Sequence, residues 1–155
     1  MTSRERWDRM EAVLADMRSP QRIAKKGWYN TPEYTVLQRE YCELRDIERN
    51  EALARGWPVW QEGQVFIVLD ADGSEWDGYC TRYDLDAETV TGDLFPLGDT
   101  LARLRSDRWT RRTVQLAQVQ HWSYFDARNK AQADAEKARQ WAEAHPLFAD
   151  CEVTA

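Results

Sequence analysis

The chain has few of the residues that build metal and redox sites. Its 155 residues include two histidines and three cysteines, with no C-x-x-C pair. The cysteines, Cys42, Cys80 and Cys151, are odd in number and far apart, which is typical of reduced thiols in a cytoplasmic protein. A zinc site would have to recruit carboxylates in their place. We therefore expect no metal and no cofactor.

Long apolar runs are also missing. The longest uninterrupted apolar run, residues 65–69, is much shorter than the roughly 20 residues that cross a bilayer. Residues 1–11 lack the apolar stretch of a secretory signal. We therefore expect a cytoplasmic protein without a membrane span.

The motifs of common catalytic sites are absent as well. The sequence contains no glycine-rich phosphate loop and no dinucleotide fingerprint. Cys80 and His121 are a conceivable nucleophile and base, but no orienting motif or oxyanion-type glycine turn accompanies them. No lysine occurs between Lys26 and Lys130, so the lysine that often assists metal-dependent phosphodiester chemistry is missing. These absences favour a non-enzymatic protein.

What the chain does contain is a clear succession of secondary-structure patterns. Apolar residues at three- and four-residue spacing predict helices over residues 3–18 and 31–55. Thr2 and Glu5 have the spacing of a capping box before the first helix, and Gly56 is a natural terminator of the second. The first third of the chain is thus expected to be helical.

The middle of the chain changes to the period of β-strands. A short β-branched run at 64–70 is followed by Asp72-Gly73, which predicts a type I′ hairpin turn with positive φ at both central residues. Residues 75–83 alternate as a return strand, and residues 88–92 predict a third strand. These patterns together indicate an antiparallel meander.

The last part of the chain is less uniform. Residues 109–122 fit a helix or a strand, and we favour a strand that closes the sheet. Asp99 precedes a short predicted helix. A helix is expected over 123–145, with Ser123 or Asp126 as its N-cap and with alanines on one face that permit close packing on a sheet or another helix.

These patterns predict the α+β class, with N-terminal helices, a central antiparallel β-meander and a long C-terminal helix. A length of 155 residues suits a single domain, residues 1–155. It would comprise a helical part (1–56), a β-meander part (57–122) and the C-terminal helix (123–145).

Charge is segregated along the chain. Residues 59–100 hold ten acids and one base, a net of −9, and residues 101–113 hold five arginines and one acid, a net of +4. One interpretation is intramolecular, with basic segments beside the acidic sheet in exposed pairs worth about 0–1 kcal/mol each. A second is an acidic face that steers a protein partner, and a third is nucleic-acid binding by the basic clusters.

The acidic hairpin supplies the candidate protein-binding surface. Its carboxylates exceed what a turn needs, and they surround a tryptophan, a residue type that often anchors protein interfaces. The candidate partner-binding residues are Asp70, Asp72, Glu75, Trp76, Asp77, Asp84 and Asp86.

The same hairpin invites a metal interpretation. Counted from Asp70, glycine falls at position 4 and Thr81 replaces the bidentate glutamate at position 12 of an EF-hand, so a calcium loop does not fit. Convergence of Asp70, Glu75 and Asp77 would still allow a catalytic divalent cation. A metal-dependent enzyme at these residues is therefore one alternative.

Two segments combine cations with aromatic residues, a pattern that suits phosphate contacts and base stacking. The net charge of −6 argues against a strong nucleic-acid binder. The candidate residues for this alternative are Arg22, Lys25, Lys26 and Trp28 in segment 22–29, and Arg108, Trp109, Arg111 and Arg112 in segment 108–112.

Eight tryptophans are more than a small domain is expected to bury, so we expect one or two at a partner interface or at a homodimer interface. The preferred hypothesis is a small non-enzymatic cytoplasmic protein that binds a protein partner through its acidic hairpin and exposed tryptophans. Accessory or inhibitory proteins of bacteria, phages or mobile elements are of this kind.

Overall fold

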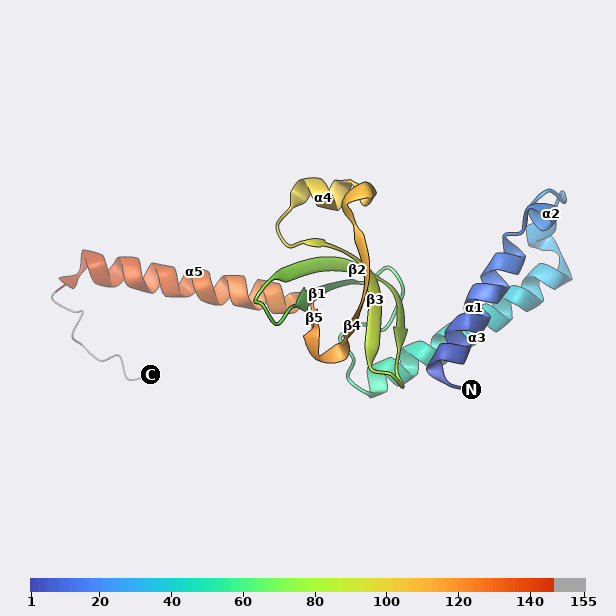
Figure 1. Cartoon of the computed structure of the whole chain (residues 1–155), viewed down its shortest axis with the longest axis horizontal. Helices are drawn as coiled ribbons and strands as arrows, with labels where there is room; N and C mark the ends of the chain where they lie inside the picture. Colours follow the sequence, from blue (N-terminus) through green and yellow to red (C-terminus); the bar gives the residue numbers. More distant parts are fainter. Residues whose placement is uncertain (147–155) are drawn as a thin grey trace. The chain divides into compact units, whose positions relative to one another are not determined.

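The computed structural model describes residues 1–146 of the chain (Figure 1). Its contacts divide the chain into two compact units, Met1–Gln120 and a second unit that begins at His121. The first unit contains the N-terminal helices and nearly all of the sheet, and the second contains the long C-terminal helix. The predicted α+β class and order of elements are confirmed, while the single domain stays a prediction.

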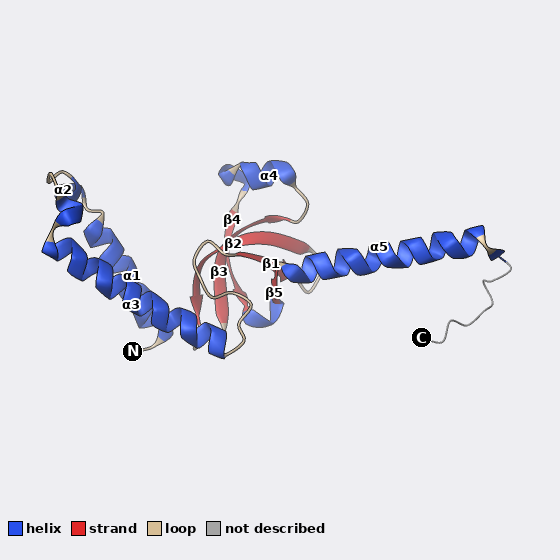
Figure 2. Cartoon of the chain, turned by 180° about the vertical axis from the view of Figure 1, so that it is seen from behind, coloured by secondary structure: helices blue, strands red, loops and turns tan. Residues whose placement is uncertain are grey.

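Two long helices form an antiparallel pair at the start of the first unit. They are α1 (Ser3–Met17) and α3 (Pro32–Ala54), and they lie side by side in both views (Figures 1 and 2). The capping box before α1 is confirmed. The Glu5 N–H donates to Thr2 Oγ1 at 3.2 Å, and the Thr2 N–H donates to Glu5 Oε2 at 2.6 Å.

Short helical turns connect these two helices. Gly56 follows the end of α3, as predicted. Its φ is +69°, in the left-handed region that glycine adopts readily because it has no side chain. The connector between α1 and α3 contains α2 (Pro20–Ile23) and the 3-10 turn η1 (Trp28–Asn30).

Five strands form one sheet in the spatial order β4-β3-β2-β1-β5. The pairs β1–β2, β2–β3 and β3–β4 are antiparallel, so the predicted meander is confirmed and extended by a strand. The chain then crosses to the free edge of β1, where β5 pairs. The strands are β1 (Val65–Leu69), β2 (Glu75–Asp84), β3 (Thr89–Pro96), β4 (Thr110–Gln115) and β5 (Val119–His121).

The inner face of the sheet packs an aromatic ring across two glycines. Phe66 stands opposite Gly78, where an added Cβ would lie 2.3 Å from Leu94 Cδ2. A Cβ on Gly92 would lie 2.6 Å from Phe66 Cζ and 2.8 Å from the backbone oxygen of Tyr79. All three distances are shorter than van der Waals contact. A side chain at Gly78 would displace Leu94, and one at Gly92 would displace the Phe66 ring or the backbone of β2.

The helical pair contributes to the same core. Trp7 and Met10 of α1 and Ala52 of α3 are buried in one cluster with the inner side chains of the sheet. The ring of Trp7 meets the ring of Tyr83 edge-on, with 5.2 Å between centroids. These contacts fix the start of α1 and the end of α3 against β2.

The Asp72-Gly73 hairpin is confirmed, but the predicted type I′ turn is wrong. Gly73 has φ +86°, whereas the only non-glycine residue with positive φ among residues 1–146 is Glu88. Asp72 bonds its own turn instead, because its Oδ1 accepts from the Ser74 N–H at 2.9 Å and from the Ser74 hydroxyl at 2.6 Å. These side-chain hydrogen bonds stabilise a turn geometry other than type I′.

The segment 109–122 is mostly strand, as favoured from the sequence. The strands β4 and β5 are separated by one 3-10 turn, η3 (Leu116–Gln118), which accounts for the helical spacing in the segment. Asp99 caps a short helix as predicted, since its Oδ1 accepts the Ala102 N–H at 2.9 Å. The loop before β4 thus contains α4 (Thr100–Leu104) and η2 (Ser106–Arg108).

The second unit is the helix α5 (Ser123–Ala144), close to its predicted length. The predicted caps are wrong, because the N-cap is Trp122, and both Ser123 and Asp126 lie inside the helix. The Ser123 N–H donates to His121 Nδ1 at 3.2 Å instead. No residue of α5 is buried, and its own described unit offers no other element on which the alanine face could pack.

Two of the cysteines can be placed. Cys42 and Cys80 are free thiols, and burial raises the pKa of Cys80 to about 12. Cys151 lies outside the described residues. Within residues 1–146, no helix is both long enough and apolar enough to cross a bilayer.

Candidate functional site

The hairpin carboxylate Asp70 is engaged within the chain. Arg112 donates to both of its oxygens, at 3.0 and 3.1 Å, and Gln118 Nε2 donates at 3.2 Å. The same guanidinium stands over the ring of Trp76, 5.4 Å from its centroid. The bonds from Arg112 hold the pKa of Asp70 below its usual value. Asp70, a candidate partner-binding residue, is therefore paired with Arg112, a candidate nucleic-acid-binding residue.

Asp84 and Asp86 shape the turn between β2 and β3. Asp84 Oδ1 accepts two backbone N–H groups of this turn, each at 3.0 Å. Asp86 Oδ2 accepts the Ser3 N–H at 2.9 Å, and its other oxygen lies 3.8 Å from Arg55. Like Asp72 at its own turn, these carboxylates have partners within the chain, which are local for Asp84 and distant in sequence for Asp86.

The remaining hairpin candidates lie in β2. Glu75 and Asp77 occupy alternate positions, so they project from the face opposite to Trp76. Asp77 is half-buried, and its Oδ1 accepts the Gly78 N–H at 3.0 Å. Burial raises the pKa of Asp77 above its usual value. This carboxylate is therefore destabilised in its charged form, in contrast to a solvated turn residue.

The metal-dependent alternative needs Asp70, Glu75 and Asp77 to converge. Asp70 turns toward Arg112 and Trp76, on the other side of the sheet from Glu75 and Asp77. Among residues 1–146, no three His, Cys, Asp or Glu side chains are grouped so that they could hold a metal ion. The convergence that this alternative requires is therefore not found among the described residues.

The basic segment 108–112 is also used internally. Arg111 donates to both oxygens of Asp93, at 2.9 and 3.0 Å. The indole N–H of Trp109 donates to the Ala102 carbonyl at 2.8 Å, which ties the residue before β4 to α4. Arg108 is exposed. The ring expected to stack on bases is thus held in place by packing and by a hydrogen bond.

The basic segment 22–29 shows the same pattern. Arg22 pairs with both oxygens of Asp16, at 2.8 and 3.0 Å, and stands 4.6 Å from the ring centroid of Trp28. Trp28 is 3% exposed, and its indole donates to the Met17 carbonyl at 2.9 Å. Both lysines of the segment are exposed. These contacts agree with the intramolecular interpretation of the charge segregation.

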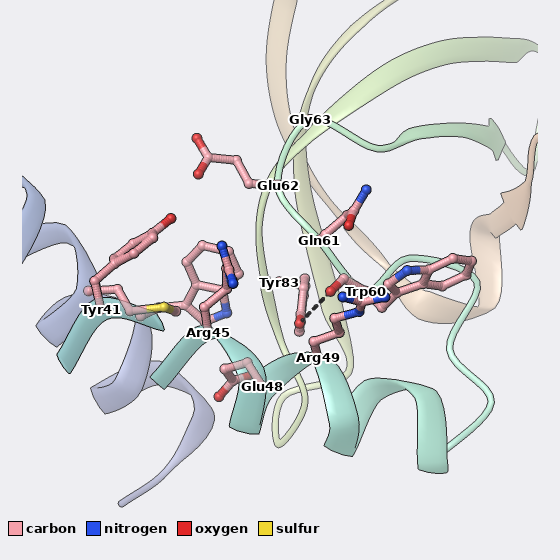
Figure 3. A pocket seen from close by; sticks show the side chains of 11 residues that line it. Tyr41, Arg45, Glu48, Arg49, Trp60, Gln61, Glu62, Gly63 and Tyr83 are labelled. Carbon is pink, nitrogen blue, oxygen red and sulfur yellow. Dashed lines mark hydrogen bonds between the residues drawn. The ribbon is translucent and has the colours of Figure 1, made fainter. Parts of the chain in front are cut away.

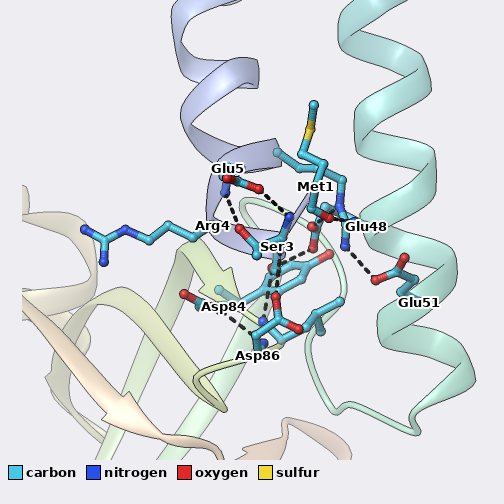
Figure 4. Close-up of polar contacts among 12 residues, drawn as sticks. Met1, Ser3, Arg4, Glu5, Glu48, Glu51, Asp84 and Asp86 are labelled. Atoms are coloured by element: carbon cyan, nitrogen blue, oxygen red, sulfur yellow. Dashed lines mark hydrogen bonds and ion pairs between the residues drawn. The ribbon is translucent and has the colours of Figure 1, made fainter.

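A buried polar network, which the sequence did not reveal, joins α1 to α3 (Figure 4). Glu48 is 1% exposed, and it accepts from Arg6 Nε at 2.5 Å and from the Ser3 hydroxyl at 3.0 Å. Arg6 also donates to Glu51 at 2.6 Å. The Leu85 N–H donates to the Ser3 hydroxyl at 3.0 Å, so the network reaches the turn after β2.

Helical spacing contained a signal for this network. The buried face of α3 runs from Leu44 to Glu48 and Ala52, whereas Ile47 is 45% exposed. An acid at a core-facing position predicts a buried cation, here Arg6. Burial raises the pKa of Glu48, and the bond from Arg6 opposes that effect.

A cleft of about 540 Å³ opens between α3 and the loop of residues 60–63 (Figure 3). Arg45 and Arg49 extend from α3 on one side, and Trp60 belongs to the loop on the other. Tyr83 lies between them, and its hydroxyl donates to the Trp60 carbonyl at 3.2 Å. The volume is within the range of small-molecule sites.

Trp7 lines this cleft from α1. It is 7% exposed, and its indole N–H is buried without a hydrogen-bond partner among residues 1–146. The indole N–H groups of Trp28 and Trp109, in contrast, both reach carbonyl oxygens. Since most buried donors are satisfied, the Trp7 N–H marks a position where an acceptor is missing.

The eight tryptophans differ in exposure. The two exposed ones, Trp122 at 49% and Trp141 at 54%, both belong to the unit of α5. The buried ones are Trp7, Trp28 and Trp57, and those of intermediate burial are Trp60, Trp76 and Trp109.

Comparison with known proteins identifies no relative. No family model, no curated protein and no solved structure matches this chain.

Proposed function

We propose that the chain is a non-enzymatic cytoplasmic protein that binds another protein, with the aromatic residues of the α5 unit as its main contact. The carrying observation is the exposure of three large aromatic side chains there: Trp122 at 49%, Tyr124 at 43% and Trp141 at 54%. Tryptophan and tyrosine are the residue types that most often dominate binding energy at protein interfaces.

The composition of α5 supports a helix that gains a partner. An isolated helix in water owes little stability to propensity alone, and most helices are stabilised by packing on one face. The 22 residues of α5 include no buried side chain. The alanines of one face allow another backbone to approach closely. They are Ala131, Ala135, Ala138 and Ala142.

The acidic hairpin has a secondary role in this proposal. Asp72 is exposed at its tip, and Glu75 and Asp77 are partly exposed on the outer face of β2. Negative charge placed there raises the rate of encounter with a basic partner more than it raises affinity. An accessory or inhibitory protein would be served by such a combination of steering charge and aromatic anchors.

A comparative capture experiment tests the proposal. The double variant Trp122→Ala/Trp141→Ala removes the two indoles, and Leu101→Ala/Leu104→Ala is the control, because these leucines of α4 are 63% and 82% exposed. Proteins lost with the first variant and kept with the second are identified by quantitative mass spectrometry, purified and titrated. We expect the purified partner to bind the tryptophan variant at least about tenfold more weakly than it binds the wild-type chain.

Three results would overturn the proposal. Equal capture by both variants would show that the indoles are not anchors. Concentration-dependent dimers of the chain alone, abolished by Trp122→Ala/Trp141→Ala, would identify a second copy as the occupant of α5. A salt-sensitive gel shift with DNA or RNA, lost in Lys25→Ala/Lys26→Ala, would favour the nucleic-acid alternative instead.

A further inference from the structure

We propose that the cleft between α3 and residues 60–63 binds a small aromatic carboxylate. The inference is independent of the proposed protein partner, because the cleft lies wholly within the unit Met1–Gln120.

The walls of the cleft favour a flat apolar group. Tyr41 and Trp60 stand on its two sides, with Tyr83 of β2 between them (Figure 3). Trp7 of α1 also lines the cleft. Its volume of about 540 Å³ admits one or two fused rings with a short side chain. Aromatic faces bind flat rings by stacked or edge-on contacts.

One residue that lines the cleft has a hydrogen-bond donor without a partner. The Trp7 indole N–H has no acceptor among residues 1–146. The buried acceptor nearby is occupied, because Glu48 receives Arg6 on one oxygen and Ser3 on the other. The Tyr83 hydroxyl donates to the Trp60 carbonyl. A ligand that satisfies this N–H must bring an acceptor atom, and the indole must shift to expose its buried nitrogen to the cleft.

The arginines of the cleft favour a ligand whose acceptor atoms carry a negative charge. Arg49 has no ion pair in the part of the chain that the structure describes, and the ion pair of Arg45 is with its neighbour Asp46, where both side chains are at least half exposed. Exposed pairs of this kind are weak and are easily exchanged. Two guanidinium groups on adjacent turns of α3 thus stand ready for a carboxylate.

Glu62 is the opposing charge. It lies in the loop that faces α3, it is exposed, and it has no ion pair among the described residues (Figure 3). Its carboxylate repels an anionic ligand and so limits affinity. Removing this charge should therefore strengthen binding, which is the opposite of what loss of a structural residue does.

The test uses indole-3-acetate as the probe, with indole-3-acetamide as its neutral counterpart and cyclohexylacetate as a non-aromatic anion. Binding is measured by ligand-observed NMR and by calorimetry. The wild-type chain should bind indole-3-acetate at millimolar concentration or below, and the two other compounds about tenfold more weakly, because each lacks either the charge or the flat ring.

Four variants assign the binding to the cleft. Arg49→Gln should weaken binding about tenfold, and Arg39→Gln, an exposed arginine of the same helix outside the cleft, should leave it unchanged. Glu62→Gln should tighten binding roughly twofold to fivefold. Trp7→Phe keeps a ring and removes the N–H, so it should weaken binding in a protein whose circular dichroism is unaltered.

The inference is overturned if indole-3-acetate does not bind at concentrations up to about 10 mM. It is equally overturned if the amide binds as tightly as the acid, or if Arg49→Gln and Arg39→Gln bind alike. Because Arg49 and Glu62 are exposed, these two variants should fold normally and decide the question even if Trp7→Phe does not fold.

Discussion

The acidic hairpin and the aromatic cleft differ in how far the chain satisfies its own polar groups. In the hairpin, Asp70 meets Arg112 in a bidentate pair, and Asp72 and Asp84 accept hydrogen bonds in their own turns. In the cleft, the Trp7 indole has no acceptor and Arg49 has no ion pair within the described chain. The sequence pointed to the hairpin as a binding site, yet among the described residues more polar groups without partners lie at the cleft.

The difference teaches that abundance of a residue type does not measure its availability. Ten acids between residues 59 and 100 look like an unpaired surface when they are counted along the chain. Strand pairing places Asp93 opposite Arg111, and a turn places Asp70 beside Arg112. Charges that are separated by many residues in sequence thus cancel in space.

The largest expected effect comes from breaking the network beside the cleft. Arg6→Ala leaves the Glu48 carboxylate buried without its cation, and we expect the free energy of unfolding to fall by about 3–5 kcal/mol. Urea unfolding followed by tryptophan fluorescence measures this loss. The matched control is Arg9→Ala in the same helix, whose pair with Glu40 is exposed.

The control should cost less than about 1 kcal/mol, because exposed ion pairs contribute little. Equal losses for Arg6→Ala and Arg9→Ala would show that burial of the Glu48 carboxylate does not decide the stability of the helical pair.

The next effect tests whether packing holds β3 against β1 and β2. Gly92→Ala places a Cβ 2.6 Å from Phe66 Cζ and 2.8 Å from the Tyr79 backbone oxygen. Because the backbone cannot yield easily, we expect a loss of about 1–3 kcal/mol in thermal or urea unfolding. Thr91→Ala in the same strand removes an exposed hydrogen bond to Thr113 and should cost less. An unchanged melting temperature for Gly92→Ala would contradict the tight contact.

A smaller loss is expected when the hairpin pair is broken. Asp70→Asn removes the charge that meets Arg112, which should cost about 0.5–1 kcal/mol at pH 7. The pKa of Asp70 is lowered in the folded state, so its stabilisation is present above the unfolded-state value and is lost as pH falls through the folded-state value. The wild type and the variant should therefore converge in melting temperature at low pH. A constant difference from pH 7 to pH 2 would contradict this origin.

The smallest effect has the opposite sign. Burial raises the pKa of Asp77 above the usual 3.8, so the folded state binds its proton more tightly than the unfolded state. The stability of the wild type therefore declines as pH rises from the unfolded-state to the folded-state pKa. Asp77→Asn should stabilise the fold at pH 7, by less than about 1 kcal/mol because the side chain is only half-buried, and this gain should vanish near pH 3. Destabilisation at pH 7 would show that the charged form is needed.

Local patterns predicted most of the elements of the fold. Thr2 and Glu5 fixed the start of α1, Gly56 ended α3, and Asp72-Gly73 marked the hairpin. Each signal works through atoms within a few residues of it, so it survives without knowledge of the tertiary structure. The turn type was wrong because Asp72 can bond Ser74 in more than one backbone geometry.

The candidate sites were predicted less well, for a physical reason. A carboxylate or an indole is available only if nothing else in the chain satisfies it, and its partner can lie anywhere in the sequence. Asp70 and Arg112 are 42 residues apart, and Arg6 and Glu48 are also 42 residues apart. The cleft was not predicted because its walls come from α1, α3, β2 and a loop.

The sequence by itself determined the class of the fold, the start of α1, the end of α3 and the antiparallel meander, since periodicity and capping act at short range. The tertiary structure decided which polar groups are satisfied. It paired Asp70 of the hairpin with Arg112 of a later strand, buried Glu48 between two helices, and buried the Trp7 indole N–H without an acceptor among residues 1–146. Long-range packing alone brings those groups together, and so it alone decides which of them remain able to bind.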